Sequence, residues 1–141
     1  LSYNLYGLNF NLDNIRKAKR IILFEGEKSV MLYDSLFGSE NNISVATCGS
    51  SVSMIQVDFI KNLCNVDEVI LAYDKQFQEI GDNEYKKDIK LLTMIANKIN
   101  KYCTVSIMFD KFNLLEYKDS PIDQGKETFE YLFTNRIVQG V

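Results

Sequence analysis

Short apolar runs alternate with segments of helical spacing along most of the chain. Four runs have the length and composition of strands buried on both faces of a sheet, at residues 21–24, 43–47, 66–73 and 103–109. Apolar residues at helical spacing predict helices at residues 14–19, 28–37, 54–63, 82–101 and 120–135. Strands that alternate with helices favour an α/β fold with a mainly parallel four-stranded sheet flanked by helices.

Local signals place several helix ends. Gly38 directly follows the second helical pattern, where glycine readily ends a helix. Ser51 or Ser53 is a candidate N-cap for the third helix. Ser120-Pro121 predicts the start of the last helix, because serine is a favoured N-cap and proline suits the first helical position.

The length and composition fit one compact domain. The chain has 141 residues, of which 46% are hydrophobic and 25% are charged, as is usual for a globular protein. We expect the domain at residues 20–135, a lead-in segment at 1–19 and a tail at 136–141. Because the first residue is Leu1 rather than Met, we expect the chain to be part of a longer protein. No apolar run is long enough to cross a bilayer and the start has no signal-peptide pattern, so we expect a cytoplasmic location and no membrane partner.

The chain contains no histidine, and this absence narrows the possible chemistry. It excludes histidine general bases, Ser-His and Cys-His nucleophiles, and zinc sites with histidine ligands, so no zinc is expected in this segment. The three cysteines, Cys48, Cys64 and Cys103, are far apart among apolar residues, which favours free thiols over disulfides. The remaining chemistry depends on carboxylates, which prefer hard cations such as Mg²⁺.

The densest positive cluster precedes the first predicted strand. It consists of Arg16, Lys17, Lys19 and Arg20, in and after a short helix that Asp13 would cap. A net charge of −3 argues against a domain that binds nucleic acid through its overall charge. The cluster is therefore either a local contact for single-stranded DNA or a solvated helix face.

Three predicted strands end at an acidic residue, namely Glu25, Asp74 and Asp110. Parallel strands place their carboxyl ends at one edge of the sheet, so we expect Glu25 and Asp74 to lie close together. Two adjacent carboxylates repel each other unless they share a proton or bind a divalent cation. For Asp110 we favour the simpler interpretation that the chain returns to water there.

Several short motifs occur in an order that resembles the Toprim domain of phage-type DNA primases. They are EGEKS at Glu25–Ser29, CGS at Cys48–Ser50, DK at Asp74-Lys75, and KDSPIDQGKE at Lys118–Glu127. The resemblance extends roughly from Leu5 to Phe133. Toprim domains also occur in topoisomerases and in some nucleases, so the resemblance implies the fold more broadly than it implies one reaction.

The resemblance implies roles for several residues. Glu25 matches the family's glutamate, a general acid/base or metal ligand, and Asp74 matches the first acid of its D-x-D motif. Gln76 stands where the second acid is expected, and its amide oxygen is a neutral ligand for Mg²⁺. Asp119 and Asp123 match additional acids near the metal. An alternative role for Asp123 is helix capping next to Ser120-Pro121.

Two lysines follow the candidate acids. Lys28 and Lys75 are candidates for contacts with nucleotide phosphates, or they neutralise the acids when no metal is bound. By resemblance, the expected function is primer synthesis with Mg²⁺ or Mn²⁺ from nucleoside triphosphates on a single-stranded DNA template. A replicative helicase is the expected partner, through domains outside this chain.

Two other functions remain open from the residues. A Toprim nuclease would use the same metal site with water as the nucleophile. A receiver-like interaction module would accept a phosphoryl group on Asp74, with Lys111 after the fourth strand as its basic residue.

Overall fold

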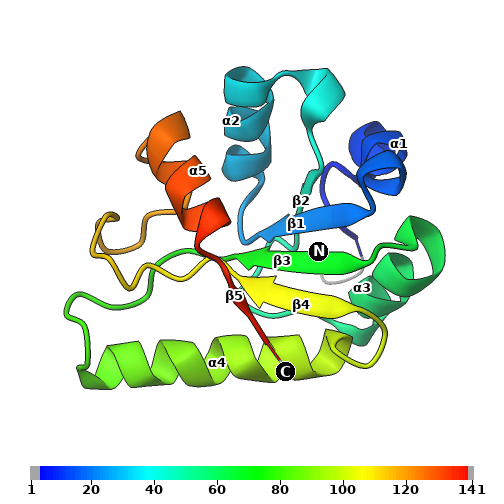
Figure 1. The fold of residues 1–141 in the computed structure, drawn as a ribbon. Coiled ribbons are helices and arrows are strands. Elements are labelled where there is room, and N and C mark those ends of the chain that lie inside the picture. Colours follow the sequence, from blue (N-terminus) through cyan, green and yellow to red (C-terminus); the bar gives the residue numbers. More distant parts are fainter. Residues whose placement is uncertain (1–3, 140–141) are drawn as a thin grey trace.

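The predicted strands form one sheet in a computed structural model that describes residues 4–139 (Figure 1). The strand order is β2-β1-β3-β4-β5. The first four strands are parallel, and the last is antiparallel to β4. The strands are β1 Arg20–Phe24, β2 Ser44–Ala46, β3 Glu68–Ala72, β4 Thr104–Ile107 and β5 Ile137–Val138. The α/β fold class is confirmed, and the two-residue β5 adds a fifth strand to the four predicted.

Helices cover both faces of this sheet. Figure 1 shows α4 below the sheet and α2 and α5 above it, and the two apolar clusters of the protein follow this division. One cluster joins α1, α3 and α4 to one face of the sheet, and the other joins α2 and α5 to the opposite face. The helices are α1 Leu8–Ala18, α2 Glu27–Phe37, α3 Met54–Phe59, α4 Asn83–Ile99 and α5 Lys126–Thr134.

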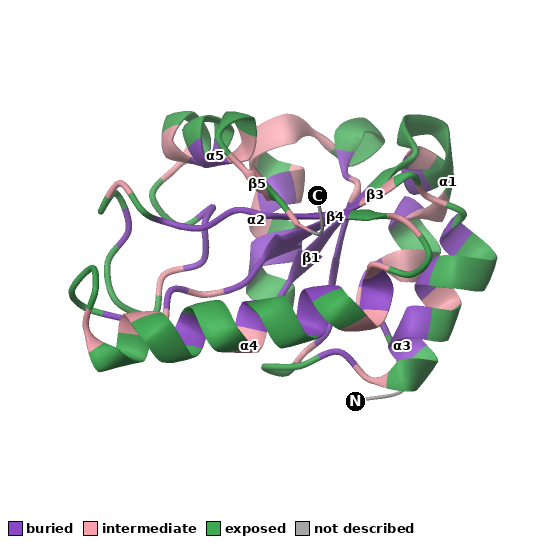
Figure 2. Cartoon of the chain, turned by 60° about the horizontal axis from the view of Figure 1, so that its bottom comes forward, coloured by how far each residue is buried: buried purple, intermediate pink, exposed green. Residues whose placement is uncertain are grey.

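The central strands are buried on both faces, as their continuous apolar runs predict. In β1, Ile21 and Leu23 belong to the cluster with α4, whereas Ile22 and Phe24 belong to the cluster with α2. All four side chains are 0% exposed. Figure 2 shows the central strands mainly as buried, β5 as intermediate to exposed, and the outer sides of the helices as exposed. This double burial fixes where β1 and β3 end, and hence where the strand-end acids lie.

The first helix begins earlier than predicted. It starts at Leu8, after Gly7 with a φ of 88°, so Asp13 lies inside the helix and does not cap it. Ile15 from this helix is 0% exposed, and Tyr6 forms an antiparallel bridge with Ala46 of β2. Residues 4–19 therefore pack on the same core as the sheet.

The last helix begins later than predicted. Ser120-Pro121 starts a turn, and α5 begins only at Lys126, after Gly125 with a φ of 98°. The carboxylate of Asp123 accepts a hydrogen bond from the Ser120 backbone N–H at 2.9 Å, which closes this turn. The prediction of a helix start at Ser120-Pro121 was wrong because the left-handed conformation of Gly125 separates the turn from the helix.

Other helix ends agree with the sequence. Gly38 follows α2 with a φ of 89°, and Ser53 caps α3 in a reciprocal pair with Gln56. The three cysteines are free thiols, although only Cys64 is fully buried. Within residues 4–139, no helix combines the length and apolar composition that a membrane span requires.

Candidate active site

Glu25 and Asp74 lie at the point where the strand order reverses. Strands β1 and β3 are neighbours, and Phe24 at the end of β1 pairs with Ala72 at the end of β3. The chain leaves β1 toward β2 on one side and then crosses to β3 on the other side. Such a switch point opens a crevice at the carboxyl ends of the strands, where α/β proteins bind ligands. The predicted convergence of the two acids follows from this topology.

A cavity of about 550 Å³ opens at this edge of the sheet. Its volume lies within the range of small-molecule binding sites. It brings together the strand-end acids with residues from α4 and from the loop before α5. The lining residues are Glu25, Ser50, Tyr73, Asp74, Gln76, Glu84, Lys87, Asp88, Leu91 and Lys118.

Tyr73 ties the turn after β2 to the cavity. Its hydroxyl lies 2.9 Å from the Thr47 hydroxyl and donates a hydrogen bond to the Ser51 carbonyl at 3.3 Å. Both ends of this link lie in buried or half-buried surroundings. The small-residue turn around Ser50 is therefore held against the end of β3.

The acids at this edge repel one another. Burial raises the pKa of the Glu25 carboxyl, while a hydrogen bond from the Asp74 backbone N–H partly lowers it. Burial, as the largest cause, and then the charges of Glu25, Asp123 and Asp119 together raise the pKa of Asp74 to about 7. Three other predicted site acids are thus close enough to Asp74 to affect its ionisation.

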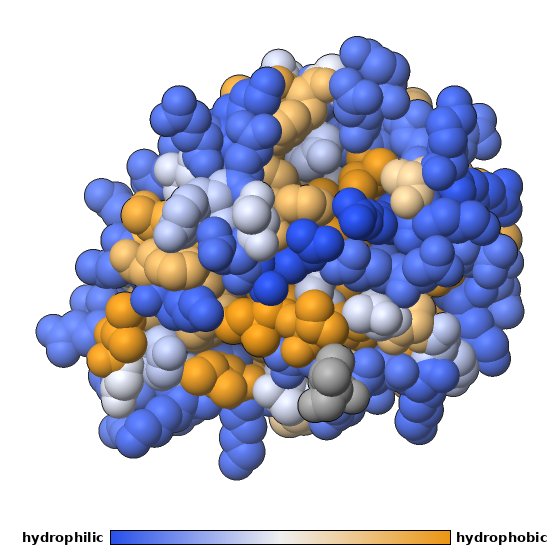
Figure 3. All heavy atoms as spheres, in the orientation of Figure 1, coloured by the Kyte–Doolittle hydropathy of each residue, from blue (hydrophilic) through white to orange (hydrophobic). Residues whose placement is uncertain are grey.

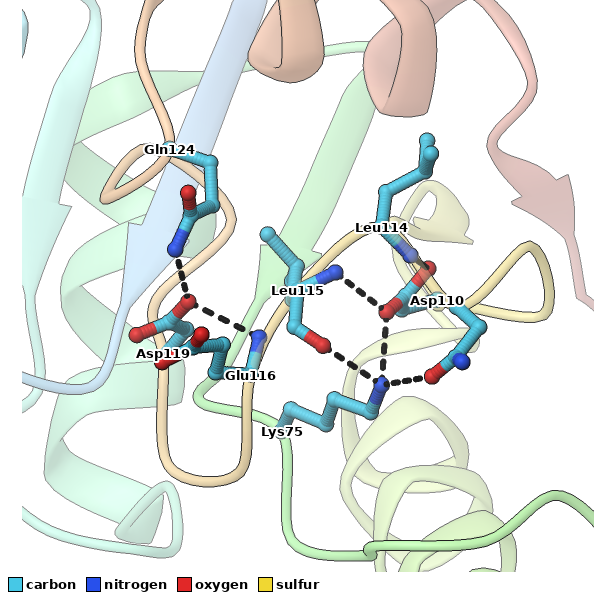
Figure 4. Close-up of polar contacts among 8 residues, drawn as sticks. Lys75, Asp110, Leu114, Leu115, Glu116, Asp119 and Gln124 are labelled. Atoms are coloured by element: carbon cyan, nitrogen blue, oxygen red, sulfur yellow. Dashed lines mark hydrogen bonds and ion pairs between the residues drawn. The ribbon is translucent and has the colours of Figure 1, made fainter.

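Asp119 and Asp123 are anchored in the loop before α5. The Oδ2 atom of Asp119 accepts hydrogen bonds from the Glu116 backbone N–H at 2.9 Å and from Gln124 Nε2 at 2.7 Å (Figure 4). The Asp123 carboxylate closes the turn at Ser120, as described above. Neither carboxylate lines the cavity, but both are near enough to Asp74 for their charges to raise its pKa. A local role in the loop and a role at the site are therefore compatible.

Lys75 does not face the site, and the prediction that it contacts nucleotide phosphates was wrong. Its side chain is 2% exposed. Its ammonium donates to Asp110 Oδ2 at 2.8 Å, Asn113 Oδ1 at 3.1 Å and the Leu115 carbonyl at 2.8 Å, as Figure 4 shows. An ammonium group has three donors, so all of them are used. Because all three donors are used, Lys75 also does not neutralise Glu25 or Asp74.

Asp110 is a buried structural acid and does not mark a return to water. It is 3% exposed. It also accepts hydrogen bonds from the backbone N–H groups of Leu114 and Leu115, at 2.9 and 2.8 Å. These bonds and the charge of Lys75 keep the pKa of Asp110 low although burial opposes them.

The positive cluster lies at the other end of β1 from the acids. Arg20 begins this strand and Glu25 follows its last residue, which separates them by about 17 Å at the usual rise of a strand. Arg16 donates to the Leu63 carbonyl at 2.8 Å, and Arg20 is 3.4 Å from Glu68 Oε1. Arg16, Lys17, Lys19 and Arg20 are exposed but do not line the cavity. The cluster therefore does not belong to this cavity, and its contact with single-stranded DNA stays a prediction.

Lys28 is exposed in the first turn of α2. It is not among the cavity residues. Its predicted contact with phosphates stays a prediction. Lys87 and Lys118, which were not among the predicted site residues, do line the cavity.

Asp88 is the acid that the sequence reasoning missed. It lines the cavity from α4 and is 4% exposed. Its pKa is raised to about 6, because burial and the charge of Glu25 outweigh the lowering effect of a hydrogen bond from the Gln76 backbone N–H. The available signal was its spacing, because Asp88 lies four residues before Leu92 and seven before Ile95 on the buried face of α4.

The donor atoms at this edge suit a hard divalent cation. Glu25, Asp74 and Asp88 offer carboxylate oxygens, and Gln76 offers an amide oxygen, which are ligands that Mg²⁺ and Mn²⁺ accept. Among residues 4–139 no three acids already surround one point at ligand distances. Mg²⁺ is commonly bound by one or two carboxylates together with water and substrate phosphates. The residues therefore fit such an ion without a preformed cage.

Comparison with known proteins gives a relative by sequence and several neighbours by structure. No protein-family model matches the chain. It is 37% identical to the SPbeta prophage-derived uncharacterized protein YorJ of Bacillus subtilis (strain 168), over 97% of this chain. The chain spans 38% of the length of that relative.

Solved structures of primases share the fold. A DNA primase domain from Pseudomonas aeruginosa matches with a TM-score of 0.67 at 19% identity, over 97% of this chain and 40% of that one. The Aquifex aeolicus primase matches with a TM-score of 0.64 at 20% identity, over 97% of this chain and 30% of that one. A DnaG primase catalytic domain bound to single-stranded DNA matches with a TM-score of 0.64 at 22% identity, over 97% of this chain and 40% of that one. The chain therefore has the Toprim fold of the catalytic domains of DnaG primases.

Proposed function

We propose that this chain is the metal-dependent nucleotidyl-transfer domain of a primase. The observation that carries the proposal is the convergence of Glu25 and Asp74 at the β1/β3 switch point, in a cavity large enough for a nucleotide. Asp119 and Asp123 add negative charge beside Asp74. An acidic cavity repels a triphosphate unless a divalent cation is bound, and phosphoryl transfer uses such a cation.

The roles of the residues follow from their places in the cavity. Glu25 and Asp74 would hold Mg²⁺ or Mn²⁺, with the neutral amide of Gln76 beside them. The ion would neutralise charge on the reacting phosphate. Lys87 and Lys118 line the same cavity and replace Lys75 as candidates for phosphate contacts.

Support for a DNA template comes from the relatives rather than from the charge of this chain. One neighbour was solved bound to single-stranded DNA and another, from Mycobacterium tuberculosis, in complex with double-stranded DNA. The prophage origin of YorJ supports a phage-type enzyme. Nucleoside triphosphates as substrates, a replicative helicase as partner and a cytoplasmic location stay predictions.

The other two functions are less well supported. A nuclease would need the same ion with water as the nucleophile, and none of the three solved structures described above is a nuclease. A receiver-like module needs a lysine beside the phosphorylated acid. Lys111 instead lies 5.5 Å from the ring of Phe112 and lines a separate apolar hollow of about 160 Å³. That hollow lies against β5, on the face of the molecule that Figure 3 shows with a band of apolar residues.

The test is an assay of the full-length protein with Mn²⁺, the four nucleoside triphosphates and single-stranded DNA of mixed sequence. We expect short RNA products that are lost in Glu25→Gln and Asp74→Asn and retained in Asp58→Asn, an exposed acid on α3. Degradation of the DNA without RNA products would replace the proposal with the nuclease. Products that survive both site substitutions would overturn the site.

A further inference from the structure

Asp88 is a buried acid with an unused acceptor atom at the edge of the cavity. Its side chain enters from the first half of α4, and the residue is 4% exposed. Its carboxylate accepts a hydrogen bond from the Gln76 backbone N–H, but its Oδ1 atom has no hydrogen-bond partner. Asp88, Glu25, Asp74 and Gln76 line the same cavity.

Burial of a carboxylate oxygen without a partner is unfavourable, and such atoms in native proteins call for a specific explanation. A neighbouring cation does not supply one within residues 4–139. The ion pairs there are Arg20–Glu68, Lys75–Asp110 and Arg136–Glu68. The buried Lys75, which follows Asp74 in the sequence, pairs with Asp110 and not with Asp88.

The position that Asp88 contacts is the one that lacks an acid. Gln76 offers a neutral oxygen two residues after Asp74, where a carboxylate would add a full negative charge. The contact between Asp88 and the Gln76 backbone brings a carboxylate to this place from a different element. The chain thus carries the missing charge at the same part of the cavity, although not at the same sequence position.

We propose that Asp88 is a further carboxylate of the divalent-cation site and replaces the acid that position 76 lacks. The proposal rests on the proposed function, because it assumes that Glu25 and Asp74 bind the ion. Asp88 Oδ1 then either coordinates the ion or accepts a hydrogen bond from one of the water molecules that Mg²⁺ retains. The bond from the Gln76 N–H orients the carboxylate for this role.

The first test is a calorimetric titration of the protein with Mn²⁺ alone. Asp88→Asn keeps the size of the side chain and removes its charge. Glu84→Gln is the matched control, because Glu84 lies one turn earlier on α4, lines the same cavity and is exposed. We expect Asp88→Asn to weaken Mn²⁺ binding by about tenfold or more and Glu84→Gln by less than about threefold. Equal effects of the two substitutions would show a general loss of charge and would overturn the proposal.

The second test restores the acid at position 76. In the Asp88→Asn background, Gln76→Asp should recover most of the lost Mn²⁺ affinity, whereas in the wild-type background it should raise affinity much less. Additive effects in the two backgrounds would contradict the replacement. Circular dichroism verifies folding, and thermal unfolding without metal should show Asp88→Asn at least as stable as the wild type, because an unpaired buried charge is removed. A clear loss of stability instead would indicate a structural role and count against the proposal.

The same titration separates failure of this proposal from failure of the proposed function. If the wild type binds Mn²⁺ and Glu25→Gln abolishes binding while Asp88→Asn has no effect, only the role of Asp88 is refuted. If the wild type binds no Mn²⁺, or Glu25→Gln leaves binding unchanged, the cation site itself is refuted.

Discussion

Removal of the Asp74 charge should stabilise the metal-free protein, and the gain should grow with pH. The folded chain raises the pKa of Asp74 from 3.8 to about 7, through burial and then through the charges of Glu25, Asp123 and Asp119. Above about pH 4 the folded protein therefore holds a proton that the unfolded chain has released. The free energy of unfolding therefore falls as the pH rises from the unfolded pKa of 3.8 to the folded pKa of about 7, and it levels off above that pKa.

The magnitude follows from this pKa. Each pH unit between the two pKa values costs about 1.4 kcal/mol. The interval from about pH 5.5 to the folded pKa is about 1.5 pH units, which corresponds to a loss of about 2 kcal/mol in the free energy of unfolding. Because the Asp74 carboxyl is only half-buried, screening by solvent reduces this loss to about 1–2 kcal/mol. The stability difference between Asp74→Asn and the wild type should increase by this amount between about pH 5.5 and about pH 8.5.

Urea unfolding followed by circular dichroism, in the presence of a chelator, measures this difference. Asp58→Asn is the control, because Asp58 is exposed on α3, and its difference from the wild type should not change with pH. In a second set of samples without chelator, Mg²⁺ added at high pH should stabilise the wild type and leave Asp74→Asn unaffected. A stability gain for Asp74→Asn that is the same at both pH values would refute the crowding of acids around Asp74.

Three further variants test other parts of the structure. Lys75→Met should lower the free energy of unfolding by about 3–5 kcal/mol in urea denaturation, because it leaves Asp110 buried without its cation. A loss below about 1 kcal/mol would contradict the buried ion pair. Ser53→Ala should cost about 1 kcal/mol in the same assay through loss of the α3 cap, and an unchanged midpoint would argue against that cap. Lys17→Gln with Lys19→Gln should weaken single-stranded DNA binding in low-salt filter assays without changing Mn²⁺ affinity, and a parallel loss of Mn²⁺ affinity would contradict the separation of the two surfaces.

The sequence predicted the main strands and the meeting of the two principal acids because both depend on strong local patterns. The apolar run before Glu25 is continuous and belongs to a strand that is buried on both faces. Parallel connections then bring Glu25 and Asp74 to one edge whatever the details of packing. These inferences needed only the order of strands and helices.

The sequence could not predict the direction of Lys75. It follows Asp74 directly, but consecutive side chains of extended backbone point to opposite sides. Asp74 lines the cavity, and Lys75 points to Asp110, which is 35 positions later in the chain. Only the three-dimensional structure shows that Asp110, at the start of the loop after β4, is the partner of Lys75.

Asp88 was missed because its apolar neighbour Ile89 also fits the helical spacing of Leu92 and Ile95. Leu92 and Ile95 are buried as this spacing predicts, yet Ile89 is 41% exposed and Asp88 is 4% exposed. An acid on a buried helical face contradicts the apolar pattern, and such contradictions are expected at functional sites. The late start of α5 has a different cause, since the conformation of Gly125 outweighs the local signal of Ser120-Pro121.

The most direct test of the central claim is the anomalous scattering from a crystal of the protein soaked with Mn²⁺. The account predicts a manganese peak in the cavity at the β1/β3 switch point, about 2.0–2.6 Å from carboxylate oxygens of both Glu25 and Asp74. Saturating Mn²⁺ that gives no peak there, or a peak that contacts neither carboxylate, would contradict it.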